Sequence, residues 1–305
     1  MMSNSIIKYP IYTFDNQILF PAGSEMSPGN IDDLISTNKN TYSSVSLLNY
    51  KSVRKDIIKF IRSAPSYSVI FGDDKQIASL MNHLGSVTLI SPVLKMLDYF
   101  KEHDYYTYKH HLLVWALSTH IATVMADDYI DLLKEAESGP THDVGKICVP
   151  LDILKKETPL SKKEKSHLRH HTIAGHVLLS YYHQDRDKLA PIVARDHHER
   201  MNGSGYPGGI NLDNSLVDIV IVSDIYDALI SPRPYRHVSF DNRTACEEIT
   251  KMAEKKELHW KVVQCLISLN RKKKSHFTEC KIPHEKRGPP PPSNNYGITI
   301  PESSQ

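Results

Sequence analysis

Histidine and aspartate residues recur through the middle of the chain, and this series constrains the fold more than any other feature. Its centre is the adjacent pair His142-Asp143, which is followed by Gly145 and Lys146. Such a pair lets one backbone turn present a neutral imidazole and a carboxylate to the same point, and a divalent metal accepts both donors. A single pair often arises by chance. It gains weight here because further members of the series accompany it: His110, His171, His197, His198 and Asp224.

Composition sets the class of protein. A chain of 305 residues is long enough for two domains, and its formal net charge of +2 neither favours nor excludes a nucleic-acid surface. Seventeen histidines are a high count that points toward metal chemistry. The four cysteines are scattered without a CxxC pair, which fits a reducing cytoplasm. No apolar run approaches the ~20 residues of a membrane helix and no signal peptide is expected, so we expect a cytoplasmic protein.

Residues 1–88 are predicted to form a small α/β domain with a linking helix near its end. Short alternating apolar runs between residues 6 and 20 suggest a hairpin. Ser27-Pro28 is typical of a helix N-terminus, because serine caps the helix and proline fits its first position. This domain is interpreted as regulatory or as a partner surface. The alternative is a packing cap without a ligand of its own.

Residues 89–273 are predicted to form a helical bundle. Apolar residues recur at helical spacing from residue 108 onward, and Ser91-Pro92 gives another helix start. Beyond this region the chain becomes lysine-rich and then proline-rich, so residues 274–305 are interpreted as a disordered tail. The expected helices of the bundle span residues 108–126, 130–136, 161–182, 191–199, 216–229, 241–254 and 260–270.

Longer motifs surround the histidine and aspartate series. They include Tyr-Thr-Tyr-Lys-His-His at 106–111, His-Asp-Val-Gly-Lys at 142–146, His-His-Glu…Gly-Ser-Gly-Tyr-Pro at 197–207 and Asp-Ile-Tyr-Asp-Ala-Leu…Arg-Pro-Tyr-Arg at 224–236. Over residues 91–271 the chain resembles the HD-GYP family of HD-domain metal phosphohydrolases. The resemblance implies a mainly α fold, an HD-GYP helical bundle behind the small α/β domain. It also implies hydrolysis of the bacterial signalling molecule cyclic di-GMP by a metal cluster, usually of iron or manganese.

The resemblance implies a set of metal ligands. Asp143 would bridge two metals, and His197 and His198 would each serve one of them. The family pattern prefers His110 over its neighbour His111. The alternative for His171 is an ordinary histidine in a histidine-rich stretch. The full set implied is His110, His142, Asp143, His171, His197, His198 and Asp224.

The catalytic and substrate contacts are also implied by resemblance. Lys146, together with the bridging Asp143, would assist the attack on phosphorus, and Tyr206 would stack on a guanine or reach a phosphate. Arginines suit phosphate because they contact its oxygens through two parallel hydrogen bonds. The substrate-binding residues implied are Tyr206, Asp227, Arg233 and Arg236.

Several positions depart from the family pattern. Tyr106 stands where members with a third metal carry a glutamate, so two metals are predicted instead of three. Asn202 replaces an aspartate before the Gly-Tyr-Pro motif. These departures leave the ligands of a two-metal site in place, but they bear on turnover and on substrate preference.

The sequence therefore predicts a metal-dependent phosphodiesterase that hydrolyses cyclic di-GMP by a hydroxide bridging two divalent metals, iron or manganese. One alternative is a weakly active or inactive receptor that binds cyclic di-GMP and signals through protein contacts of the Gly-Tyr-Pro loop or the N-terminal domain. Another is an HD phosphohydrolase for a different nucleotide. Neither a nucleic-acid polymer nor a membrane is expected as a partner.

Overall fold

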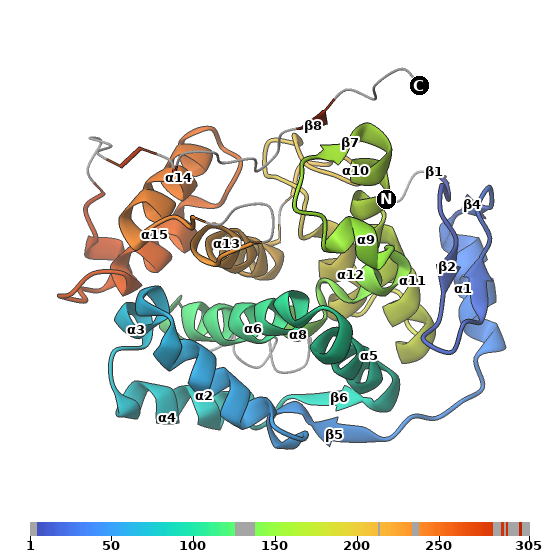
Figure 1. The fold of residues 1–305 in the computed structure, drawn as a ribbon, viewed down its shortest axis with the longest axis horizontal. Helices are drawn as coiled ribbons and strands as arrows, with labels where there is room; N and C mark the ends of the chain where they lie inside the picture. The colour runs from blue at the N-terminus through green and yellow to red at the C-terminus, as the bar shows by residue number, and fades with distance from the viewer. Residues whose placement is uncertain are drawn as a thin grey trace.

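The computed structural model describes residues 5–125, 138–212, 214–233, 238–282, 288, 289, 291, 299 and 300. The described chain is mainly helical, with short two-stranded ribbons (Figure 1). This confirms the predicted fold class. Among the described residues, no helix combines the length and the hydropathy that a membrane span requires.

The first strands form two antiparallel ribbons. Strand β2 (Ile11–Tyr12) pairs with β3 (Ile18–Phe20), which gives the hairpin predicted over residues 6–20. Its turn contains Asn16, whose φ of 64° lies in the left-handed region that asparagine tolerates. Strand β1 (Ser5–Ile6) lies outside this hairpin and pairs with β4 (Glu25–Met26).

Helix α1 (Pro28–Thr37) begins as the sequence predicts, because the Ser27 hydroxyl accepts a hydrogen bond from the Asn30 amide at 3.2 Å. A third ribbon pairs β5 (Ser44–Ser46) with β6 (Thr88–Ile90). The segment between these strands is helical. Its elements are η1 (Leu47–Asn49), α2 (Val53–Ser63), α3 (Pro65–Phe71) and α4 (Asp74–Leu84).

Helix α6 (Tyr105–Met125) lies at the centre of the bundle, with α13 (Ser215–Ile230) and α5 (Ser91–His103) packed beside it (Figure 1). Its side chains are buried on all faces through most of its length, as expected for a core helix. The helix predicted over residues 130–136 lies outside the described residues.

The remaining elements follow in chain order, and most match the predicted helices within a few residues. The helix expected over residues 161–182 is in fact two helices, which meet at His170. The elements are α8 (Ser138–Thr141), η2 (Val144–Cys148), α9 (Leu151–Leu154), β7 (Leu160–Ser161), α10 (Lys162–Arg169), α11 (His171–His183), α12 (Leu189–Asp196), α14 (Asn242–Glu254), α15 (Trp260–Leu269), η3 (Phe277–Glu279) and β8 (Thr299–Ile300).

The N-terminal elements share one hydrophobic core with the bundle. Helices α2 and α4 pack against α6, whereas α1 and β2 pack against α11 (Figure 1). The beginning of the expected tail is packed as well, since Phe277 and Cys280 are buried in the same core. Because the core is shared, the predicted domain boundary at residue 88 stays a prediction. The packed part of the chain continues past residue 273, where the tail was expected to begin.

Two glycines allow η2 to lie directly on helix α11. A Cβ atom added to Gly145 would come within 2.0 Å of the His171 carbonyl oxygen and 2.4 Å of the Gly175 nitrogen. These distances are far shorter than real carbon contacts, and the clashing atoms are backbone atoms that cannot turn away. Gly145 thus permits the close approach that places His171 beside Asp143.

We expect Gly145→Ala to lower the free energy of unfolding by about 3 kcal/mol or more, because the backbones of η2 and α11 must separate. Gly29→Ala on α1 is the matched control, since its added Cβ finds no atom closer than 3.9 Å. Urea unfolding of both variants measures the difference. Equal stability of the two variants would contradict this account of the contact.

Buried His176 makes stability depend on pH. Its ring lies on α11 with Nδ1 3.0 Å from the Pro191 carbonyl oxygen, and burial lowers its pKa to about 4. An unfolded histidine has a pKa of about 6.5, so the unfolded chain takes up this proton first as the pH falls. The contribution of neutral His176 is therefore present above pH ~6.5 and is lost progressively toward pH ~4.

The free energy of unfolding should fall by up to roughly 1.4 kcal/mol per pH unit in this window because of His176 alone. His176→Gln should show a shallower fall between pH 7 and 5 than the unaltered chain. His103→Gln, which replaces an exposed ring, is the control variant. Urea titrations at several pH values test this, and identical slopes in all three proteins would refute it.

Candidate metal centre

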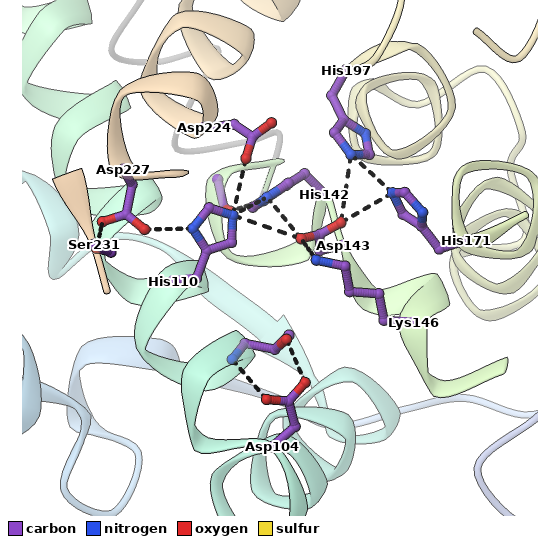
Figure 2. A network of polar contacts seen from close by, with 12 residues as sticks. Asp104, His110, His142, Asp143, Lys146, His171, His197, Asp224, Asp227 and Ser231 are labelled. Atoms are coloured by element: carbon purple, nitrogen blue, oxygen red, sulfur yellow. Dashed lines mark hydrogen bonds and ion pairs between the residues drawn. The ribbon is translucent and has the colours of Figure 1, made fainter. Parts of the chain in front are cut away.

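The structure brings the histidine and aspartate series together at one buried point (Figure 2). The ligand atoms of the first group, and likewise those of the second, all lie within 4.8 Å of one another. Asp143 belongs to both groups and lies between them. The first group is His110, His142 and Asp143, and the second is Asp143, His171, His197 and His198.

The seven side chains come from five separate segments of the bundle, since His142-Asp143 and His197-His198 are adjacent pairs. His110 lies on α6, one turn after the start of that helix, where Asp104 accepts hydrogen bonds from the Thr107 amide and hydroxyl. Asp224 lies in the middle of α13, and its Oδ1 is 3.0 Å from Nε2 of His110. Five further residues complete the cluster: His142, Asp143, His171, His197 and His198.

Three of the histidines are oriented by the ends of short helices. The ring Nδ1 of His142 lies 2.7 Å from the Gly139 carbonyl, and that of His171 lies 2.6 Å from the Leu168 carbonyl. His197 lies 3.0 Å from the carbonyl of Ala194 in the same way. Each acceptor lies three residues earlier, at a helix end where carbonyl groups lack partners within the helix.

These contacts determine which ring nitrogen carries the proton. A carbonyl oxygen can only accept, so each Nδ1 must donate, and in the neutral ring the inward Nε2 keeps its lone pair. Yet Nε2 of His171 lies 3.3 Å from Nε2 of His197. Such facing lone pairs share no proton and repel, and a cation between them would remove the repulsion.

Asp143 is the negative centre of the cluster. Its Oδ1 lies 3.1 Å from Nε2 of His171, and its Oδ2 forms an ion pair with Lys146. Burial alone would raise the pKa of this carboxyl group, but the charge of Lys146 and the neighbouring histidines hold it well below its usual value. Asp143 is therefore ionised although it is only 2% exposed.

The imidazole of His110 is held between two carboxylates. Burial would lower its pKa, but contacts with Asp224 and Asp227 raise it to about 9. Burial lowers the pKa of His197 to about 4, and it also lowers the pKa of His198. Asp224 and Asp227 therefore favour a positive charge on His110, whereas burial favours neutral rings at His197 and His198.

Asp227 lies behind His110 in the core, and its predicted contact with the substrate stays a prediction. Its side chain is fully buried, and its Oδ2 lies 2.6 Å from Nδ1 of His110. Its Oδ1 accepts hydrogen bonds from Tyr67 at 2.8 Å and from Ser231 at 3.0 Å. Because both oxygens are occupied within the core, Asp227 orients His110 (Figure 2).

Tyr67 is a site residue that the sequence did not reveal. It lies on α3, in the N-terminal segment, and its ring is fully buried. Its hydroxyl supports Asp227, which in turn supports His110, so the N-terminal segment takes part in the metal centre. No motif marks Tyr67. Only its place beside α13 in the folded chain connects it to the site.

His197 and His198 lie in one group instead of being divided between the two groups. Their ring centroids are 4.2 Å apart, and both rings lie about 5 Å from that of His171. The backbone at the end of α12 turns both side chains to the same side. His197 is still near the first group, since its ring lies 5.1 Å from that of His142.

The Gly-Tyr-Pro loop covers one side of the cluster. The ring of Tyr206 is stacked on His198 with centroids 4.6 Å apart. A Cβ on Gly205 would lie 2.4 Å from the His198 carbonyl oxygen, so glycine permits the loop to lie this close. Glu199 anchors the loop by accepting hydrogen bonds from the Gly208, Gly209 and Ile210 amides.

The predicted arginines are only partly described. The guanidinium of Arg233 lies 4.7 Å from the ring centroid of Tyr106, and that ring is stacked beside His110. Arg233 is thus near the first group, whereas Arg236 lies outside the described residues.

His111 is absent from both groups, and its ring packs against Phe100.

Comparison with known proteins gives the family. The family described as "HD domain" matches residues 98–258, more than half of the chain. The chain belongs to the HD-domain family. The match begins just before α6 and ends after α14, so it includes every residue of the two groups and Asp224.

Similar HD-domain proteins include three named phosphodiesterases. A cyclic di-GMP phosphodiesterase of Thermotoga maritima is 35% identical over 148 residues, 48% of this chain and 40% of that protein. One of Pseudomonas aeruginosa is 34% identical over 187 residues, 60% and 44% of the two chains. A 3'3'-cGAMP-specific phosphodiesterase of Vibrio cholerae is 32% identical over 114 residues, which are 37% of this chain and 22% of that protein. The matched part covers less than half of each relative.

One solved structure aligns with most of the chain. It is Bd1817, described as an HD-GYP-type protein of Bdellovibrio bacteriovorus, with 16% identity and a TM-score of 0.44. The alignment covers 87% of this chain and 94% of that one.

The support that Tyr67 gives to His110 leads to a prediction about metal affinity. We expect Tyr67→Phe to weaken metal binding by about ten-fold, because groups that orient a metal ligand typically contribute 10–100-fold. The control is Tyr226→Phe, which removes another buried hydroxyl, one bonded to Asn270. Competition with a chromogenic chelator measures the affinity. Equal affinity in the two variants would show that the Tyr67 hydroxyl does not act through His110.

Proposed function

We propose that the cluster holds two divalent metals that share Asp143. One would be held by His110, His142, Asp143 and Asp224, and the other by Asp143, His171, His197 and His198. The observation that carries this proposal is the set of inward Nε2 lone pairs of His142, His171 and His197, whose Nδ1 protons are already engaged outside the cluster. Those of His171 and His197 face each other at 3.3 Å. A cation bound among these rings would accept the lone pairs and remove their repulsion.

The donor set suits first-row transition metals. Imidazole nitrogens bind iron, zinc and copper, and carboxylates also accept manganese. We propose iron or manganese, as the family resemblance implies. Tyr106 lies beside His110 where a third metal would require a carboxylate, and this supports two metals instead of three.

We infer that the reaction is hydrolysis of a phosphodiester in cyclic di-GMP. The inference is supported by family membership and by relatives named for this activity. In the reaction the oxygen of water forms a bond to phosphorus and the ester oxygen leaves with a proton. Two bound divalent metals supply Lewis acidity and make water more acidic.

Residues of this chain would position the substrate. Lys146 is a partly buried cation paired with Asp143, and it is placed to attract a phosphate oxygen. Tyr206 lies beside His198, where its hydroxyl would reach a phosphate. Arg233, near the first group, offers hydrogen bonds to the second phosphate. Asp227 contributes by orienting His110.

The decisive variant is Asp143→Asn, which keeps the volume of the side chain but removes the shared charge. Protein purified without oxygen should contain about two metals per chain, and the variant should contain fewer than about one. Hydrolysis of cyclic di-GMP should fall at least about 100-fold. Asp152→Asn makes the same chemical change at an exposed position of α9 and should leave both quantities unchanged.

Metal analysis and chromatography of the products measure these outcomes. Two metals with nucleotide binding but without turnover would instead favour the receptor. Faster turnover of another cyclic dinucleotide would change the substrate and keep the metal centre. A chain that binds no metal would overturn the proposal.

A further inference from the structure

A cavity of about 830 Å³ lies beside the metal centre and is separate from it. It is enclosed by the β1–β4 ribbon on one side and by α10, α11 and α12 on the other, with the Gly-Tyr-Pro loop at one end. No member of the two groups lines it. Neighbours of the ligands do: His170 lines the cavity while His171 faces the metal centre, and Asp196 lines it while His197 faces the metal centre.

Positive charge dominates the lining of this cavity. Lys162, Lys165 and Arg169 come from α10, and Lys8 comes from the chain just after β1. Among the described residues, no carboxylate lies within ion-pair distance of Lys8, Lys162 or Arg169. Burial and the nearby charge of Arg169 lower the pKa of Lys165, as expected for cations held together.

The acidic residues of the lining are already occupied. Both oxygens of Asp196 accept hydrogen bonds from Arg195, at 2.6 and 2.7 Å. The carboxylate of Glu199 accepts the three backbone amides of the Gly-Tyr-Pro loop. The third, Asp187, is an exposed carboxylate 3.8 Å from Arg186, which also forms an ion pair with Asp32 at 2.6 Å. What remains for a ligand is therefore cationic.

The rest of the lining is apolar and aromatic. Ile6, Ile173 and Ile210 contribute aliphatic surface, and Tyr206 contributes an aromatic ring. The Arg169 guanidinium lies over this ring, 4.5 Å from its centroid. Ligand sites typically combine such surface with a few convergent polar groups in 300–1,000 Å³. A ligand with an anionic group and a flat apolar body fits this combination.

We propose that this cavity is a second nucleotide site, in which Lys8, Lys162 and Arg169 hold a phosphate ester and the aliphatic wall receives the base. Arginine and lysine are the side chains that bind phosphate oxygens. The site shares Tyr206 with the metal centre, since one face of that ring meets Arg169 while the ring also stacks on His198.

The test is calorimetric titration of the full, metal-loaded chain with GMP, cyclic di-GMP and inorganic phosphate at low salt. Lys162→Glu should weaken GMP binding by several-fold, and the double variant Lys8→Glu/Lys162→Glu by at least about ten-fold, because like charges then face the phosphate. Lys162 is the first residue of α10, where an acidic side chain is favoured, so loss of binding would not reflect loss of the helix.

Lys163→Glu is the matched control. It makes the same change of charge in the same helical turn, but Lys163 does not line the cavity, so GMP affinity should change less than about two-fold. GMP binding should also persist after the metals are removed with a chelator. This separates the second site from the metal centre, whose own test is metal content and turnover.

Three results would overturn the proposal. The first is the absence of binding by GMP and cyclic di-GMP, and the second is an equal effect of Lys162→Glu and Lys163→Glu. The third is loss of all binding on metal removal while the chain stays folded. Inorganic phosphate that binds as tightly as GMP would refute the role of the aliphatic wall. A chain that binds GMP here but hydrolyses nothing would refute only the proposed function.

Discussion

The carboxylate of Asp143 lies inside the protein among imidazole rings, and the rest of the structure is arranged around that charge. A buried carboxylate is strongly unfavourable unless cations or hydrogen bonds compensate for lost water. Lys146 supplies one positive charge, and the rings of His171 and His197 approach from the other side. The two groups of ligands meet only at Asp143, so both halves of the centre depend on this residue.

Backbone geometry prepares the surrounding histidines. Helices α8, α10 and α12 each end just before a histidine that donates Nδ1–H to a carbonyl three residues earlier. Carbonyl groups at helix ends need hydrogen-bond donors, and these three rings provide them. The contacts thus fix both the orientation and the tautomer of each ring. Gly145 then allows the segments that carry Asp143 and His171 to touch.

The N-terminal segment is part of this arrangement. Tyr67 contacts Asp227 within the core, and the β1–β4 ribbon forms one wall of the cationic cavity. The segment therefore reaches the metal centre through Tyr67, and a change in the position of α3 would act on His110 through Asp227. A regulatory role of residues 1–88 stays a prediction.

The local signals in the sequence were sufficient for most elements. Ser27-Pro28 predicted the start of α1, and apolar spacing predicted α6, α13 and α15, because capping and periodicity depend on neighbouring residues. The break at His170 was missed, since residues 161–182 keep a helical pattern across it.

The sequence by itself determined which residues could form the centre, because motifs that resemble the HD-GYP family include His110, His142-Asp143, His171 and His197-His198. Tertiary structure alone decided how they are used. It placed Asp227 behind His110, added Tyr67, and put His197 and His198 on one side of Asp143. These outcomes depend on packing between segments far apart in the chain. Local sequence carries no record of such contacts.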